Sequence, residues 1–213
     1  MPCQGHSDHR SERRLTMSPL ATLKDLDNNG IDHADNDALA ERLLESVSAQ
    51  IRDAAGSPIS LGEYTFTIPS EQSRKLDLPC RPVRNVSKVL VDGEETTGWR
   101  LFGSSIYRDE PWGPYGGIPV PVTITATIGC DPIPADIIRL ACAYVAAGLR
   151  QHKDGGPGNR RGVAYERIDD YQIGFIQSGD AVDAIDDMEL PEMTRKRLRS
   201  RFGSSAVSIG VFR

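Results

Sequence analysis

Residues Leu76 to Gly93 read LDLPCRPVRNVSKVLVDG, and this stretch decides how the rest of the chain is organised. Its two prolines bracket a turn, and the valine-rich run that follows favours a β-strand. The strand ends in Asp92-Gly93, a dipeptide typical of a tight hairpin turn. The stretch holds no catalytic residue types in a catalytic arrangement, and it lies between two amphipathic helical patterns. The sequence therefore predicts a β-rich insert between two helices.

Two long helices are predicted on either side of this insert. The first spans residues 36–55, where apolar side chains recur every four residues until Gly56 and Pro58 end the pattern. The second spans residues 134–152 and begins with a proline, a residue favoured in the first turn of a helix. Small side chains along this second helix permit close packing. We therefore expect the two helices to pair and to carry the hydrophobic core, with a shorter helix over residues 21–26.

The insert itself is predicted to span residues 61–129 and to form a small β element. Its β-prone stretches, separated by turn residues, are residues 64–68, 76–78, 86–91, 99–107 and 120–128. The loop at residues 109–117, DEPWGPYGG, is too rich in proline and glycine to be regular. Trp112 and Tyr115 in this loop either are exposed aromatics that make contacts or cap the small core of the insert. The sequence leaves both interpretations open.

The C-terminal part, residues 163–213, combines opposite charges with a strand-like end. After β-prone residues at 165–177, five acidic residues between 180 and 189 precede a basic helix predicted over residues 190–202. Residues 206–212 then alternate apolar with small or polar side chains, which is typical of an unpaired strand that can add to a sheet edge. An acidic linker before a basic helix suits docking to a partner. The alternatives are a solvated helix face and a tail that docks on its own domain.

Composition predicts one domain with appended ends. The 213 residues are 38% hydrophobic and 26% charged, which is ordinary for a soluble protein. We assign residues 1–18 to a disordered N-terminal extension, residues 19–162 to the core and residues 163–213 to the arm. The N-terminus lacks the apolar core of a signal peptide, and the most apolar stretch is too short to span a bilayer.

The sequence gives little support to an enzyme, a metal site or a general nucleic-acid binder. The net charge of −5 argues against a broad basic surface. The four cysteines and four histidines lack zinc-ligand spacing, so neither a metal nor a cofactor is predicted. Residues 25–30, DLDNNG, match the opening of a calcium-binding EF-hand loop, but Asn36 stands where that loop needs its final glutamate. The sequence contains no Walker loop, dinucleotide fingerprint or nucleophile elbow.

The order of these motifs resembles the head–tail connector (adaptor) proteins of tailed bacteriophages. The resemblance begins with LATLKDL at residues 20–26, continues through a capped helix and the LDLPCRPVRNVSKVLVDG stretch, and then meets a strand that ends in Ile128-Gly129. It closes with PIPAD at residues 132–136 and an alanine-rich helix, so it covers about residues 19–153. The joint order of the motifs carries the resemblance. The extra N-terminal residues, the aromatic loop and the glycine-rich break at 155–158 depart from it.

The resemblance implies the fold class α+β, mainly helical: a helical bundle with an inserted small β element and an extended C-terminal arm. It also implies a structural protein of the virion neck, made in the cytoplasm of the bacterial host, with no membrane partner. It implies a homo-oligomeric ring of about twelve copies under the portal protein, through which DNA passes without specific binding. The ring would also dock the next neck protein, the stopper. Trp112 and Tyr115 lie in the loop that departs from the family pattern, and we predict from their residue types that they form a contact loop for the neck partner or a subunit. The residues expected to dock on the portal are Arg195, Lys196, Arg197, Arg199, Arg201, Phe202, Val207, Ile209, Val211 and Phe212.

Two alternatives come from other classes of function. A nucleic-acid-binding module would use the basic C-terminal segment on phosphate groups, and it predicts a DNA affinity that falls steeply with salt. An enzyme would need a pocket with converging polar groups, which we cannot assemble from this sequence.

Overall fold

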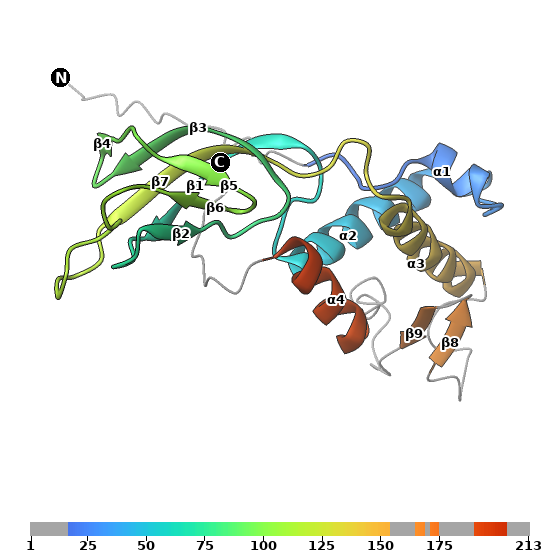
Figure 1. Ribbon diagram of the computed structural model, residues 1–213. Coiled ribbons are helices and arrows are strands. Elements are labelled where there is room, and N and C mark those ends of the chain that lie inside the picture. Colours follow the sequence, from blue (N-terminus) through green and yellow to red (C-terminus); the bar gives the residue numbers. More distant parts are fainter. Residues whose placement is uncertain (1–16, 154–164, 169–170, 175–189, 204–213) are drawn as a thin grey trace, which may run out of the picture.

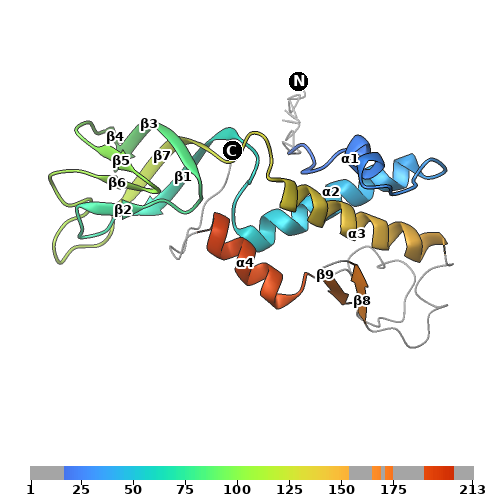
Figure 2. The same ribbon diagram turned by 45° about the vertical axis from the view of Figure 1, so that its right-hand side comes forward.

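The computed structural model describes residues 17–153, 165–168, 171–174 and 190–203, and it consists of a helical half and a β lobe. Figure 1 shows the two parts at opposite ends of an elongated molecule. Figure 2 shows the same separation from a second direction. The chain passes from the helical half into the β lobe and back, so the lobe is an insertion between two helices.

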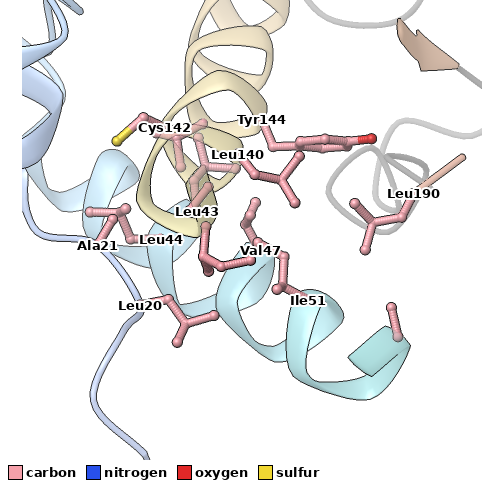
Figure 3. Close-up of a cluster of buried hydrophobic side chains, with 14 of the residues drawn as sticks. Leu20, Ala21, Leu43, Leu44, Val47, Ile51, Leu140, Cys142, Tyr144 and Leu190 are labelled. Carbon is pink, nitrogen blue, oxygen red and sulfur yellow. The ribbon is translucent and has the colours of Figure 1, made fainter. Parts of the chain in front are cut away.

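The helical half contains, in the described part of the chain, α1 (Leu23–Asn28), α2 (Asp37–Ala55), α3 (Ala135–Lys153) and α4 (Glu192–Phe202). Helix α2 packs against both α3 and α4. Its buried side chains recur at Leu43, Val47 and Ile51, the spacing that places residues on one helical face. Figure 3 shows these three side chains in one cluster with Leu140 and Tyr144 of α3. The helices predicted over residues 36–55 and 134–152 are therefore present, and they do pair.

Helix α4 belongs to this helical core. Leu198 and Phe202, on one side of α4, are 4% and 1% exposed and lie in the same apolar cluster as the α2 and α3 side chains. At the end of the helix, the Arg81 N–H donates to the Phe202 carbonyl over 2.7 Å. The segment assigned from the sequence to a C-terminal arm therefore includes a helix that is packed into the core.

The β lobe holds two antiparallel sheets, in the strand orders β1-β7-β3-β4 and β2-β6-β5. Their inner faces share one apolar core, to which Phe66, Leu76 and Ile106 contribute. Alternate residues of β7 are buried, as the two-residue period of a half-buried strand requires. The strand bounds are β1 (Gly62–Pro69), β2 (Lys75–Asp77), β3 (Val83–Val91), β4 (Glu94–Glu95), β5 (Arg100–Phe102), β6 (Ser105–Tyr107) and β7 (Pro121–Ile128).

Asp92 and Gly93 form the turn between β3 and β4 that their sequence predicts. Their φ angles are 52° and 86°, so both central residues are left-handed, as a tight two-residue hairpin of this type requires. Outside the lobe, β8 (Tyr165–Ile168) pairs with β9 (Tyr171–Gly174) in an antiparallel hairpin. Residues 165–177 were predicted to have β character, and this hairpin confirms the prediction for the described part of that stretch.

The chain enters and leaves the β lobe at neighbouring points. Ser60 and Cys130 form a parallel bridge, and the Cys130 N–H donates to the Ile59 carbonyl over 2.7 Å. Gly129 has a φ of 106°, and a Cβ at this position would lie 2.2 Å from the Ser60 carbonyl oxygen. Only a residue without a side chain allows the two segments to approach this closely. The close approach of the two chain segments at the base of the lobe therefore depends on glycine at position 129.

The prediction of a mainly helical bundle with a small β element is wrong. In the described residues, helix and strand content are about equal. The lobe consists of two antiparallel sheets that have seven strands in total. The stretches predicted at residues 64–68, 76–78, 86–91 and 120–128 fall on β1, β2, β3 and β7, whereas the single stretch 99–107 divides into β5 and β6, and β4 was not predicted. The pairing of these strands depends on residues far apart in the sequence. That pairing gives the insert a hydrophobic core of its own. The residue pattern of each short strand, taken alone, does not show this core.

Candidate interaction surface

The predicted docking residues divide between the described helix α4 and residues that lie outside the described part of the chain. Val207, Ile209, Val211 and Phe212 belong to the second group. On α4, Phe202 is buried in the helical core and so belongs to the fold rather than to an exposed docking surface. The cation of Arg201 lies 4.9 Å from the centre of the Phe202 ring. The basic residues of α4 are thus the part of the prediction that stays at the surface.

Several of these basic side chains already have partners within the molecule. Lys196 faces Glu192 one turn away, with 3.6 Å between Nζ and Oε1, and Arg201 pairs with Asp136 in the first turn of α3 over 2.5 Å. The Arg199 guanidinium lies beside Gly56, 3.5 Å from where a Cβ would stand, next to the C-terminus of α2. A cation is favourable at that end of a helix dipole. The charges of Arg201 and Arg199 therefore help to hold α4 against α3 and α2, whereas the Lys196 pair lies within α4.

The two remaining arginines of the predicted surface differ in exposure. Arg195 is half-buried, whereas Arg197 is exposed on the outer side of α4. Lys196, Arg199 and Arg201 are exposed as well, but Lys196 and Arg201 each already face a carboxylate.

Trp112 is a core residue of the β lobe. It is 1% exposed, its indole N–H donates to the Arg74 carbonyl over 3.1 Å, and its backbone N–H donates to the Ser73 carbonyl over 3.0 Å. The Arg108 guanidinium lies 4.6 Å from the ring centre on one face. Of the two interpretations of the aromatic loop, capping of the core describes Trp112. Tyr115, in contrast, is 79% exposed and is available for contact.

The sequence did not single out Phe102 and Tyr107, which form an exposed aromatic pair. Their rings meet edge to face at 6.5 Å, and Phe102 is 78% exposed. Both lie on the outer face of the three-stranded sheet β2-β6-β5 (the small sheet), because the neighbouring pair Leu101 and Ile106 faces the core. The available signal was the alternation of residues in this hairpin, which gives the face of each side chain once the pairing is known.

The outer face of the small sheet also carries a carboxylate held by its neighbours. Asp77 accepts hydrogen bonds from Lys75 over 2.9 Å and from the Ser105 hydroxyl over 2.5 Å. These bonds lower the pKa of Asp77, with Lys75 as the largest cause. Asp77 therefore stays ionised at neutral pH and keeps the Lys75 charge locally balanced.

A groove of about 360 Å³ lies between α3 and the loop that follows α1. Its walls include Cys142 and Arg139, and the Lys153 to Asp32 ion pair of 3.3 Å stands at its edge. Burial raises the pKa of the Cys142 thiol to about 11, so the thiol is protonated at neutral pH and is a poor nucleophile. The groove thus lacks an activated nucleophile among its described lining residues.

The stretch that resembles the opening of a calcium loop is used to cap and connect helices. Asp25 and Thr22 form a reciprocal capping box at the start of α1. His33 lies between two carboxylates: its Nδ1 is 2.7 Å from Asp37 and its Nε2 is 3.1 Å from Asp27. A helix end followed by a polar turn is what the structure has here. Within the described residues, no group of three or more histidine, cysteine or acidic side chains is arranged to hold a metal ion.

None of the helices in the described ranges is both long and apolar enough to cross a membrane. Comparison of the chain with protein-family models and with curated proteins gives no match.

Proposed function

We propose that this protein is a structural head–tail adaptor of a tailed-bacteriophage neck, which forms a ring under the portal, passes DNA and docks the next neck protein. The order of motifs along residues 19–153 is the observation that carries the proposal. Residues of those motifs occupy joints of the fold. Arg81 meets the end of α4, and Gly129 lies where β7 returns towards α3. The motif order is thus tied to the architecture and not to a site of catalysis.

The exposed side chains of the β lobe support a protein that acts through its surfaces. Tyr115 and Ile118 are 79% and 87% exposed, and the Phe102–Tyr107 pair adds aromatic area. Aromatic side chains are enriched among the residues that dominate protein contacts. We place contact with a neighbouring subunit or with the next neck protein on the lobe, and portal docking on the residues that follow α4. The protein would act in the virion neck after assembly in the host cytoplasm.

The partners of the α4 charges favour the adaptor over a nucleic-acid-binding module. Lys196 and Arg201 already pair with carboxylates, and Arg199 lies beside the C-terminus of α2. Strong DNA binding requires many cations that neutralise phosphates together. A ring, by contrast, multiplies weak contacts of each copy, because linked sites raise the effective concentration by factors on the order of 10²–10⁴.

Electron microscopy of the protein mixed with the portal protein from the same phage genome tests the proposal. The informative variant ends at Gly203, because α4 contributes Leu198 and Phe202 to the core and must be kept. We expect the full chain to form rings stacked on the portal and the shortened chain to lose them. A matched control that lacks residues 2–16 should still form rings.

Failure of the full chain to associate with the portal would contradict the adaptor. If the same chain instead bound DNA with an affinity that falls steeply with salt, and Arg197→Glu weakened that binding, the nucleic-acid-binding module would replace it.

A further inference from the structure

The small sheet has a free edge beside the place where α4 ends. Among the described residues, β2 is paired on one side only, in the order β2-β6-β5. The backbone groups of Leu78 and Arg74 point towards β6: the Leu78 N–H donates to the Ser104 carbonyl over 2.9 Å, and the Arg74 carbonyl accepts from Arg108 over 3.1 Å. Because backbone groups alternate in direction along a strand, those of Asp77 point to the opposite, free side.

The chain leaving α4 already approaches this edge in antiparallel orientation. Gly203 forms an isolated antiparallel bridge with Cys80, three residues beyond the end of β2. The bond from the Arg81 N–H to the Phe202 carbonyl belongs to the same bridge. Arg81 lies beyond the end of β2 and the bend at Pro79, and continuing the alternation of β2 through this bend puts the bond on the same side as the free groups of Asp77. The bridge therefore sets both the direction and the register for the residues that follow Gly203.

The sequence after Gly203 fits that register. Residues directly opposite in an antiparallel pair share a face of the sheet. Leu76 and Leu78 are 1% and 0% exposed and face the lobe core, so the residues opposite them should be small or apolar. Continued one residue at a time, the register pairs Ser205 with Leu78, Ala206 with Asp77 and Val207 with Leu76. The valine thus faces the core, and the alternation of the tail matches the alternation of β2.

We infer that residues 204–207 add to β2 of their own chain as a fourth antiparallel strand of the small sheet. The occupant is the chain's own segment because Gly203, which makes the bridge, continues directly into it. The pairing is short: Pro79 has no N–H, and the Lys75 N–H already donates to the Ser73 hydroxyl over 3.0 Å. Asp77 is the residue of this edge whose N–H and carbonyl the segment would satisfy. This inference does not rest on the proposed function, and it assigns Val207, one of the predicted portal-docking residues, to the lobe instead.

The added strand would fasten the base of the tail to the lobe and leave residues 208–213 beyond it. The tail would then leave the molecule from a defined place beside the small sheet. If the protein is an adaptor, this place is where the last residues start towards the portal, so the fastening would shorten the chain that must be ordered on docking.

Disulfide trapping tests the register. The variant Asp77→Cys with Ala206→Cys puts two thiols on the outward face of a directly opposed pair, whose Cα atoms lie about 5.5 Å apart in such a ladder, within the span of a disulfide. The matched control, Asp77→Cys with Val207→Cys, directs the second thiol to the other face. Both carry Cys3→Ser and Cys130→Ser, so that the native cysteines left, Cys80 and Cys142, are buried.

We expect a disulfide within one chain to form on the order of tenfold faster in the first variant than in the control. Equal rates, or no disulfide in either variant, would overturn the register. A disulfide between two chains, seen as a dimer on a non-reducing gel, would overturn pairing within one chain in favour of exchange between copies.

Hydrogen exchange of the native sequence gives an independent readout. The Asp77 amide should be protected in the full-length protein and should exchange on the order of tenfold faster in the full-length variant Ala206→Pro, because proline cannot donate to the ladder. The Leu78 amide, which bonds to Ser104, serves as the internal reference and should not change. Unchanged exchange at Asp77 with an intact reference would rule out the added strand.

Discussion

His33 shows how a single residue makes the stability of this fold depend on pH. Its ring, 10% exposed, has a carboxylate within hydrogen-bonding distance of each nitrogen, Asp37 on one side and Asp27 on the other. Only the doubly protonated ring can donate to both. The hydrogen bond to Asp37 is the largest cause that raises the pKa of His33 above its usual value, while burial opposes it. The contact joins α1 to the start of α2, so its strength affects how firmly α1 is held.

The variant His33→Gln should lose stability mainly at acidic pH. Because the folded-state pKa is raised, the contribution of His33 is fully present below its unfolded pKa of about 6.5 and is lost as pH rises through the folded-state pKa. Urea unfolding at pH 5.5 and pH 8.5 should give a cost of about 1 kcal/mol or less at the lower pH and a smaller cost at the higher. The exposed His152→Gln serves as the control. A cost that is independent of pH would contradict this role of the ring.

At the scale of elements, the joint between β7 and α3 is more demanding than the turns of the lobe. Gly129 and Gly103 both have positive φ angles, 106° and 62°. A Cβ at Gly129 would collide with the Ser60 and Ile59 backbone, whereas a Cβ at Gly103 would have no heavy atom within 4 Å. Substituting each glycine in turn therefore separates the cost of a left-handed backbone from the cost of a steric collision.

Gly129→Ala should destabilise the protein more than Gly103→Ala. The turn variant suffers only the left-handed backbone cost, on the order of 1 kcal/mol. The joint variant must also move two chain segments apart, and we expect at least about 3 kcal/mol. Chemical unfolding of both variants in one buffer checks the difference. Equal costs would show that the joint relaxes freely.

Local sequence patterns located most elements. The residues that mark where an element begins, where it ends and which of its faces is buried lie within the element or next to it. The four-residue apolar repeat predicted α2 over residues 36–55, and Asp92-Gly93 predicted the β3–β4 turn. Pairing and layering could not be obtained in this way. Trp112 lies in the core because its indole N–H meets the Arg74 carbonyl, a partner 38 residues away. For the same reason, the burial of Phe202 and the exposure of Phe102 follow only from the assembled fold.

At the scale of the whole molecule, α4 connects the two parts. The Phe202 side chain fills the helical core while its carbonyl accepts a hydrogen bond from Arg81 of the lobe. Cys80, next to Arg81, is itself buried in the core of the lobe. Loss of α4 from its place would thus expose apolar surface in the helical half and release the bridge to the lobe together.

Phe202→Ala should cost about 3–5 kcal/mol, the range for removing a large buried aromatic ring. Met193 lies on the same helix but is 78% exposed, so Met193→Ala should stay within about 0.5 kcal/mol of the parent protein. Urea unfolding followed by circular dichroism measures both. A small effect of the phenylalanine variant would show that α4 contributes little to the stability of the fold.

The neighbouring positions of Ser60 and Cys130 have a consequence for how such a protein can diversify. The lobe is an insertion between α2 and α3 whose two ends lie side by side, so it behaves as a closed loop. The entropy cost of closing such a loop grows only logarithmically with its length. Lengthening, trimming or exchanging the lobe therefore leaves the geometry of the helix pair almost untouched. The outer surface of the lobe can therefore change while α2 and α3 keep their packing.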